Sequence, residues 1–420
     1  MSKMLPAVAV TLVAAAAAAP AADAWTPPAT LSGADEANVV ATGAFDGSVL
    51  TGWLKPAASL SKGLGAPEPI TTADPYERVW DFGADASGGV VALTVRRHKP
   101  VQRIRARIVL ADGTRVRAYT ISDGSHSATQ PRLAVAADGT AVAAWQWHDP
   151  AGWRVQAAIR RPGQTRFDRP QTVSPPTAGK LRPTFQLAAG DGGRAALTWQ
   201  VQSGPDAALH AITAADGTFG ADQVLPDGGN WSDVALAVGA DGAVQVAYLA
   251  QPAATTSLRV ASGAVGAALG PTTVLSTGGK GTSSGSQVAA AFSADGTATV
   301  AWAKPGSRYE EGGTLEAFTR APGAPFGAAQ ALAEHAEGLS LAGGPGNAAA
   351  LAWATQGAKW SVHASLRPAG GAFGPDTTLS DPAHNALWPS IALTPTGKAI
   401  AAWVTNDSGG GSGQPTAATG

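Results

Sequence analysis

The chain has 420 residues, 14% of them charged, a formal net charge of −1 and no cysteine. So little charge disfavours a partner held by general electrostatics, such as nucleic acid or an anionic membrane surface. The lack of cysteine excludes disulfide bonds and lipid attachment to a cysteine. With 45% hydrophobic residues, 52 Gly and 30 Pro, the composition predicts a folded, turn-rich protein.

Residues 1–24, "MSKMLPAVAVTLVAAAAAAPAADA", open with Lys3, continue through an alanine-rich apolar stretch and end in the small residues of "ADA". This pattern predicts a secretory signal peptide cleaved before Trp25. The alternative is a membrane anchor, which the short, weakly hydrophobic stretch disfavours. No later stretch is apolar enough to cross a bilayer. We therefore expect a secreted or extracytoplasmic monomer whose residues 25–420 form a single domain.

A phrase recurs along the rest of the chain: an apolar run, a turn containing Gly, and a second apolar run. Gly supplies the positive φ of a tight hairpin turn, so the phrase predicts a β-hairpin. The second run ends about every 50 residues, at Trp53, Val95, Trp145, Trp199, Tyr248, Trp302, Trp353 and Trp403. A regular period of this length predicts a repeat architecture.

Each period has a second half, which begins with a strand such as "WRVQAAIRRPG" (153–163) and continues with a shorter one such as "FDRPQTVS" (167–174). Four short antiparallel strands per unit, repeated eight times, predict an all-β fold, a β-propeller of eight four-stranded blades. The first strand of a unit, such as "RLAVAA" (132–137), is small and apolar, as expected of an innermost strand covered on both faces. We expect the repeated Trp to fill the gap between blades.

The two ends of the chain complement each other. "WTPPATLSG" (25–33) matches the outer-strand phrase "FGPDTTLSD" (373–381), whereas "WPSIALTPTGKAIAAWVTNDSG" (388–409) is the front half of a unit. The N-terminal strand is therefore predicted to join the C-terminal blade, which leaves no free sheet edge. The third strand of that blade is short and contains Pro415. Seven blades followed by a tail are the alternative.

This pattern resembles secreted bacterial β-propeller repeat proteins over residues 25–420, through motifs that describe the scaffold. It is also loosely similar to sialidase-type propellers, which carry an S-x-D-x-G-x-x-W box in a turn between outer strands. In "SADGTATVAW" (293–302) Asp and Gly are adjacent and the Trp lies too far along, so the box is absent. Tyr309 and Glu310 match the residue types of a sialidase nucleophile pair, but the sequence does not identify the arginines that would accompany them.

One face of a propeller carries the loops that join blades and those that join the second strand to the third. Exposed aromatic rings beside carboxylates and amides suit sugar faces or peptide groups. The ligand-binding residues expected on this face are Trp147, His148, Asp149, Trp153, Trp231, Arg308, Tyr309, Glu310, His384 and Trp388. For "QWHDPAGW" (146–153) the alternative is a turn in which Trp147 and Trp153 pack on each other and Asp149 shapes the bend.

These observations predict a binding or scaffold module for a carbohydrate or cell-envelope polymer, or, second, for a protein partner. The rival class is a glycoside hydrolase or lyase, with Asp149, Tyr309, Glu310 and Glu311 as catalytic candidates. Two carboxylates about 5–10 Å apart in one pocket would favour hydrolysis. The sequence shows no zinc-ligand spacing, calcium loop, phosphate loop or nucleophile elbow, so we expect no metal and no cofactor.

Overall fold

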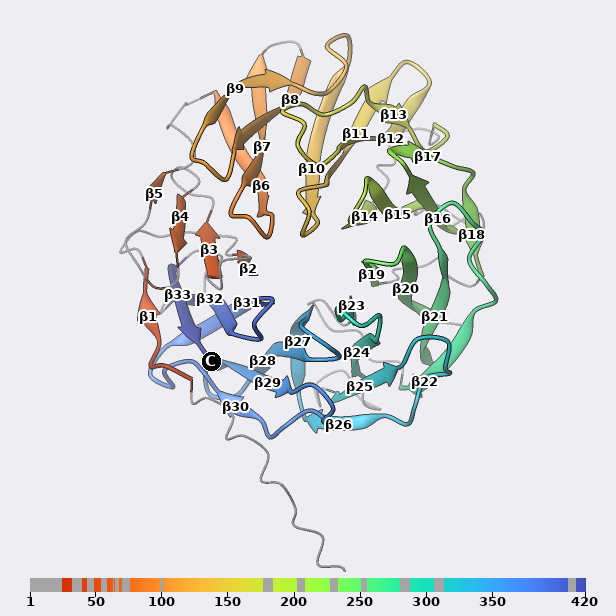
Figure 1. Cartoon of the computed structure of the whole chain (residues 1–420). Coiled ribbons are helices and arrows are strands. Elements are labelled where there is room, and N and C mark those ends of the chain that lie inside the picture. The colour runs from red at the N-terminus through yellow and green to blue at the C-terminus, as the bar shows by residue number, and fades with distance from the viewer. Residues whose placement is uncertain are drawn as a thin grey trace, which may run out of the picture.

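The computed structural model describes residues 25–31, 40–43, 49–53, 59–62, 64, 68–69, 76–98, 101–176, 184–201, 208–226, 233–250, 255–279, 288–305, 313–406 and 413–420. The described residues form strands and turns only, in sheets arranged radially around a central axis (Figure 1). This confirms the predicted all-β propeller. The predicted signal peptide lies outside the described residues.

The described strands form eight sheets, numbered here in chain order. Sheet 1 holds β2 (Val40–Gly43), β3 (Val49–Trp53), β4 (Ser59–Lys62) and β5 (Glu68–Pro69). Sheet 2 holds β6 (Glu77–Ala84), β7 (Val90–His98), β8 (Val101–Val109) and β9 (Arg115–Thr120). Sheet 3 holds β10 (Ser127–Val135), β11 (Ala141–Asp149), β12 (Gly152–Arg160) and β13 (Gln171–Thr172). Sheet 4 holds β14 (Thr184–Gly190), β15 (Arg194–Val201), β16 (Ala208–Ala215), β17 (Thr218–Phe219) and β18 (Gln223–Leu225).

Sheet 5 holds β19 (Val234–Val238), β20 (Ala243–Ala250), β21 (Thr256–Ala264) and β22 (Thr273–Gly278). Sheet 6 holds β23 (Val288–Phe292), β24 (Ala298–Lys304), β25 (Thr314–Arg320) and β26 (Gln330–Ala333). Sheet 7 holds β27 (Ala336–Gly343), β28 (Ala349–Gln356), β29 (Trp360–Arg367) and β30 (Thr377–Thr378). Sheet 8 holds β31 (Asn385–Leu393), β32 (Ala399–Asn406), β33 (Gln414–Thr419) and β1 (Ala29–Thr30).

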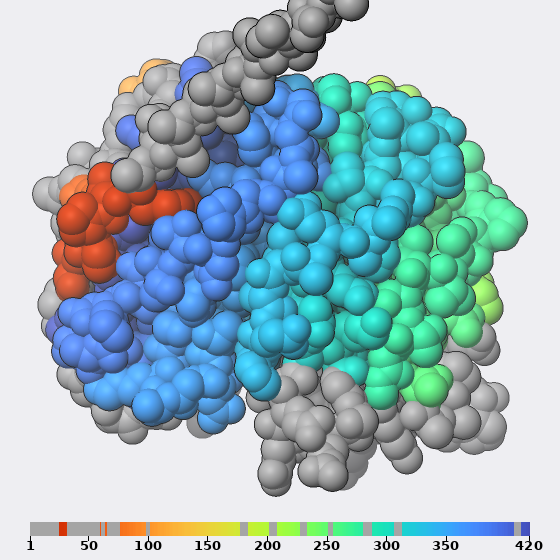
Figure 2. Space-filling model, turned by 90° about the horizontal axis from the view of Figure 1, so that it is seen from below, coloured from red at the N-terminus to blue at the C-terminus, as the bar shows by residue number. Residues whose placement is uncertain are grey.

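The N-terminal segment forms the outer strand of sheet 8, as its sequence predicts. Ala29 of β1 is paired with Ala417 of β33, and the backbone N–H of Thr26 donates to the carbonyl of Thr419 at 2.8 Å. Figure 2 shows the N-terminal residues in red against the blue C-terminal part of the chain. Each innermost strand also lies beside the innermost strand of the next sheet, and β31 lies beside β2.

The repeated turns join the first and second strands of a sheet. Gly139, Gly242 and Gly296 have φ of 88°, 86° and 83°, a region that glycine enters without steric cost. The Asp before the glycine caps its own turn: Asp138 Oδ1 accepts from the N–H of Thr140 at 2.7 Å. We call the face with these turns the hairpin-turn face and the opposite one the loop face.

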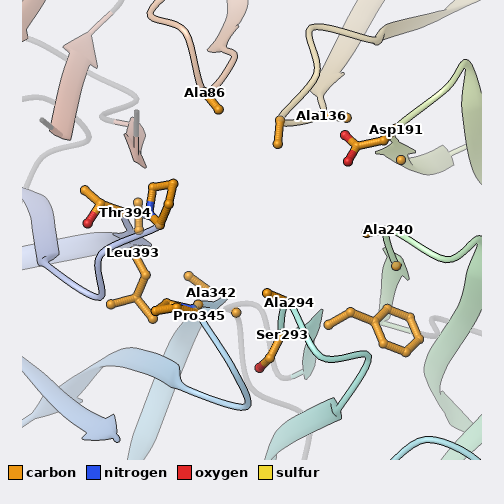
Figure 3. A pocket seen from close by; sticks show the side chains of 18 of the residues that line it. Ala86, Ala136, Asp191, Ala240, Ser293, Ala294, Ala342, Pro345, Leu393 and Thr394 are labelled. Carbon is orange, nitrogen blue, oxygen red and sulfur yellow. The ribbon is translucent and has the colours of Figure 1, made fainter. Parts of the chain in front are cut away.

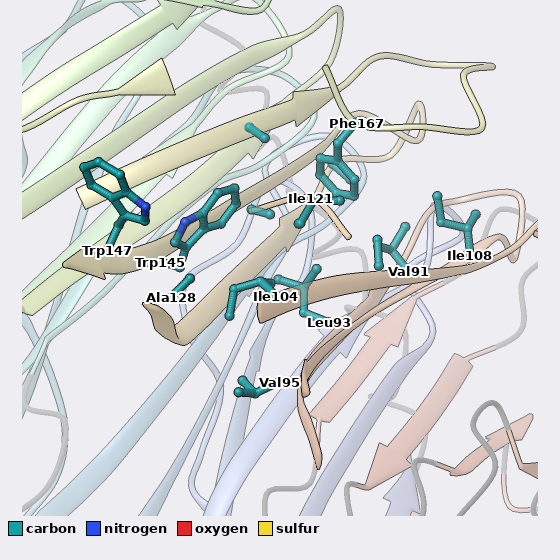
Figure 4. Close-up of a cluster of buried hydrophobic side chains, with 14 residues drawn as sticks. Val91, Leu93, Val95, Ile104, Ile108, Ile121, Ala128, Trp145, Trp147 and Phe167 are labelled. Carbon is teal, nitrogen blue, oxygen red and sulfur yellow. The ribbon is translucent and has the colours of Figure 1, made fainter. Parts of the chain in front are cut away.

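The repeated aromatic residues form the core between sheets. The fully buried members are Trp145, Trp199, Tyr248, Trp302, Trp353 and Trp403. Trp145 of β11 packs with Leu93 and Ile104 of sheet 2 (Figure 4). Trp302 of β24 packs in the same way with Leu258 and Val260 of sheet 5. The structure therefore confirms that these indoles fill the gaps between neighbouring sheets.

Candidate functional site

Four described innermost strands carry a β-bulge near their loop-face end. The register shifts lie between Val79 and Asp81 in β6, residues 129 and 132 in β10, 337 and 340 in β27, and 387 and 390 in β31. These strands belong to sheets 7, 8, 2 and 3, which with sheet 1 are consecutive around the axis (Figure 1). We call β27, β31, β6 and β10 the bulged arc. In sheets 4, 5 and 6 the strands β14, β19 and β23 pair without a shift.

Three of the bulges share one backbone conformation. Gln130, Gly338 and Trp388 occupy the same register position and have φ of 50°, 62° and 54°. Pro131 and Pro389 follow the two non-glycine residues, at a place where a strand can spare a backbone N–H. A bulge redirects the side chain it contains. The same position of the repeat therefore carries the amide of Gln130 in sheet 3, no side chain at Gly338 in sheet 7, and the indole of Trp388 in sheet 8.

The bulges present two indoles to solvent. Trp388 of β31 is 45% exposed and Trp80 of β6 is 38% exposed. Between these two strands lies β2, the innermost strand of sheet 1. Gln130 and Arg132 of β10, next along the ring from β6, are exposed as well. The loop-face end of the bulged arc therefore combines flat aromatic surface with hydrogen-bond donors and acceptors.

Two carboxyl groups of the bulged arc have raised pKa values. Asp81 packs between β6 and β10 and accepts the N–H groups of Phe82 and Leu133, both at 2.9 Å. Burial raises the pKa of Asp81 to about 6, against the opposing effects of the Leu133 hydrogen bond and the charge of Arg132. Burial also raises the pKa of Glu337 in β27, which is next to the bulge residue Gly338. A Cβ on Gly338 would lie 3.7 Å from Pro389 Cδ, so the bulges of β27 and β31 adjoin.

The loop of residues 146–153 is a hairpin between β11 and β12. Its pairs are Trp147 with Arg154, and His148 with Trp153. Since successive residues of a strand point to opposite faces, Trp147 and Trp153 do not pack on each other, contrary to that alternative. Trp147 is 8% exposed and lies in the core cluster (Figure 4). Its ring meets that of His126 edge-on, with the centroids 4.9 Å apart. Its indole therefore offers no open face, whereas exposed His148 and half-buried Trp153 pair at 4.7 Å.

Asp149 shapes the hairpin bend, as the alternative predicts. Its Oδ1 accepts the N–H groups of Ala151 and Gly152 at 2.8 and 3.1 Å, and its Oδ2 accepts from Arg154 Nε at 3.0 Å. Desolvation opposes ionisation, but the hydrogen bond from Ala151 and the charge of Arg154 outweigh it and lower the pKa of Asp149. A carboxylate held ionised by its own turn is poorly suited to act as a general acid.

The remaining predicted residues divide between described and undescribed parts of the chain. His384 is half-buried in the turn before β31, where its N–H donates to the carbonyl of Asp381 at 3.2 Å. Trp388 is the predicted residue that the bulge exposes most clearly. Outside the described residues lie Trp231, Arg308, Tyr309, Glu310 and Glu311.

The hairpin-turn face has a central depression of about 510 Å³ (Figure 3). Its lining comes from turns of sheets 2 to 8 and is mainly Ala, Gly and Pro, with Asp191, Ser293 and Thr394 as polar side chains. Backbone groups here join neighbouring turns: the N–H of Ala86 donates to the carbonyl of Ala137 at 3.0 Å. Among the described residues of the lining, Asp191 is the one carboxylate.

The described residues contain no cluster of three or more His, Cys, Asp or Glu side chains that could hold a metal ion. Within the same ranges we find no helix of the length and hydropathy that crossing a membrane demands.

No family model and no curated protein matches the sequence. Among solved structures, an unknown-function protein from Dyadobacter fermentans is 11% identical, with 94% of this chain and 98% of that chain covered and a TM-score of 0.44. The propeller domain of the Trilobed protease from Pyrococcus furiosus is 10% identical over 81% of this chain and 97% of that chain, with a TM-score of 0.43. A leech intramolecular trans-sialidase is 9% identical over 92% of this chain and 91% of that chain, with a TM-score of 0.40. Likeness at this level bears on neither activity nor ligand.

Proposed function

We propose that this protein is an exported binding module that holds a carbohydrate or cell-envelope polymer at the loop-face end of the bulged arc. The observation that carries the proposal is the exposure of Trp80 and Trp388 by bulges on either side of β2. Stacked or packed indoles are the rule elsewhere, since six described Trp side chains are buried and Trp25, Trp153 and Trp360 are half-buried. An indole redirected into solvent therefore needs a reason beyond packing. Stacking on a ligand supplies that reason.

The neighbouring groups favour a polyhydroxylated ligand. Gln130 and Arg132 supply donors beside β6, and Glu337 supplies acceptors beside Trp388. An aromatic face with flanking polar groups binds the apolar side of a sugar ring while it orients the hydroxyls. The net charge of −1 is too small to attract a highly charged polymer from a distance. A neutral or weakly charged glycan therefore fits best.

A glycoside hydrolase or lyase is the second candidate, and one observation favours it. The carboxyl groups whose pKa burial raises, Asp81 and Glu337, both lie at bulges of the bulged arc. A carboxylic acid that stays protonated nearer neutral pH is what a general acid requires. Glu337 is the better candidate, because both oxygens of Asp81 already accept backbone N–H groups.

The test is to express the protein with its own leader and to incubate it with a panel of bacterial and plant polysaccharides. Mass spectrometry then measures both polymer retained on the protein and new fragments. We expect retention without fragments, and Trp388→Ala should weaken it about tenfold, the loss of one stacked ring. Val274→Ala is the matched control, since Val274 is 52% exposed on the outer strand β22.

The other outcomes separate the alternatives. Fragments that disappear in Glu337→Gln would replace the binding module by the hydrolase or lyase. Retention that is equal in Trp388→Ala, Trp80→Ala and Val274→Ala would reject the bulged arc as the site. If no polysaccharide is retained or cut, the carbohydrate proposal fails and a protein partner becomes the leading alternative.

A further inference from the structure

A polar cluster lies in sheet 7, outside the proposed binding site. In the β28–β29 pair, Thr355 lies opposite Ser361, and Trp353 lies opposite His363. His363 Nδ1 is 2.9 Å from Asp376 Oδ1. His363 Nε2 is 2.9 Å from Ser361 Oγ and 2.9 Å from Thr355 Oγ1. A hydroxyl, an imidazole and a carboxylate thus form one hydrogen-bonded chain through the two nitrogens of the ring.

The chain of bonds assigns the protons. A carboxylate only accepts, so the Asp376 contact places the imidazole proton on Nδ1 and leaves Nε2 as an acceptor. Nε2 has one lone pair and receives one O–H. The Thr355 and Ser361 oxygens are 3.0 Å apart, so the hydroxyl that does not donate to Nε2 donates to the one that does. Ser361 and Thr355 lie equally far from Nε2, so either hydroxyl can donate to the ring while the other donates to that hydroxyl.

The core of sheet 7 holds the imidazole in place. The fully buried ring of Trp353 stacks on His363, with centroids 5.9 Å apart and planes 10° apart. Ser361 is half-buried and Asp376 is exposed, so the cluster lies at the surface with its base fixed against the interior. Fixed geometry of nucleophile, base and orienting carboxylate is what activates a serine hydroxyl.

Sheet 4 provides an internal comparison. There His210 Nδ1 lies 2.8 Å from Asp222 Oδ2, and the His210 ring stacks on Trp199 at 5.0 Å and 6°. The positions that hold Thr355 and Ser361 in sheet 7 hold Val201 and Ala208 in sheet 4. A His–Asp pair on a buried Trp is therefore a recurrent feature of the repeat that needs no hydroxyl. The hydroxyls of sheet 7 are an addition to it.

We infer that Ser361 is a nucleophile, activated by His363 and oriented through Asp376, that accepts acyl groups from carboxylic esters. Ser361 Oγ forms a bond to the acyl carbon while its proton passes to His363 Nε2. The bond from the acyl carbon to the leaving oxygen breaks, and that oxygen takes the proton from Nε2. Water then attacks the acyl-serine in the same way and releases the carboxylic acid, which restores Ser361 and requires no other reactant.

Two probes test this inference on the whole protein. The first is p-nitrophenyl acetate, followed by nitrophenolate release. The second is a biotinylated fluorophosphonate, which forms an Oγ–P bond with loss of fluoride and is located by peptide mass spectrometry. We expect label on Ser361, and Ser361→Ala and His363→Asn should each lower both signals by about 100-fold or more. Asp376→Asn should lower them at least about tenfold, since it disturbs the tautomer.

His210→Asn is the matched control, because it breaks the equivalent pair in sheet 4 and should leave both signals unchanged. Thermal melting of each variant separates loss of activity from loss of fold. A wild-type protein that neither probe modifies, or label that maps to another residue, overturns the inference even if a variant does not fold. Polysaccharide retention does not depend on Ser361, so this result and the test of Trp388 can fail independently.

Discussion

The bulged arc and the sheets opposite it are built from one repeat, yet they present different surfaces around the axis. The inner strands β27, β31, β6 and β10 have eight, nine, eight and nine residues, whereas β14, β19 and β23 have seven, five and five. The longer strands contain the bulges and expose Trp80, Gln130, Arg132 and Trp388. In β19 and β23 the described side chains are all apolar, and none is exposed. Departures from the repeat, more than the repeat itself, therefore mark where function is to be sought.

The largest expected effect tests whether the two regions share one scaffold. Trp145→Ala in sheet 3 and Trp302→Ala in sheet 6 each remove a fully buried indole between sheets. Each should lower the free energy of unfolding by about 3–5 kcal/mol. Chemical denaturation of the two variants measures this. A loss below about 1 kcal/mol for either one would mean that the two regions are not held together in the same way.

A pH effect should come from the bulged arc. Burial raises the pKa of Asp81 from its ordinary 3.8 to about 6, so the folded protein holds this proton more tightly than the unfolded chain does. The contribution of Asp81 to the free energy of unfolding is fully present below about pH 4, and it is lost as the pH rises towards and past 6. The wild-type protein should therefore lose about 2–3 kcal/mol relative to Asp81→Asn between pH 4 and pH 7. Denaturation curves that shift in parallel with pH for both proteins would contradict the pKa of Asp81.

The repeat was predictable because its signals are local. A glycine turn, an apolar run and a Trp lie within a few residues of one another, so their spacing reveals strands and sheets. The surface of the bulged arc was harder to predict from the sequence, because a bulge is defined by how two strands pair and not by one strand alone. The available signal was a proline inside a strand, Pro131 and Pro389, which disfavours regular pairing but does not say where the preceding side chain points.

Strand register also decides whether Trp147 is buried and whether the polar side chains of sheet 7 meet. Trp147 is next to the exposed His148 in sequence, and only the pairing of β11 with β12 decides which of the two faces the core. Ser361, His363 and Asp376 meet because two strands and the segment before β30 lie in a particular register. One residue of slip would put the hydroxyl and the imidazole on the other face of the sheet.

The smallest expected effect is a preference between glycine and alanine that reverses from one region to the other. At Gly338 of β27 the φ of 62° suits glycine, and a Cβ would have room, since the nearest atom outside the local chain is 3.7 Å away. Gly338→Ala should therefore lower the free energy of unfolding by about 1 kcal/mol through backbone strain alone. In the regular strand β23 the preference reverses, because Ala290→Gly weakens an extended strand by about 0.5–1 kcal/mol. Urea denaturation of both variants measures the pair. If Gly338→Ala stabilises the protein as an ordinary strand position would, the backbone of β27 is regular there and the arc loses one of its bulges.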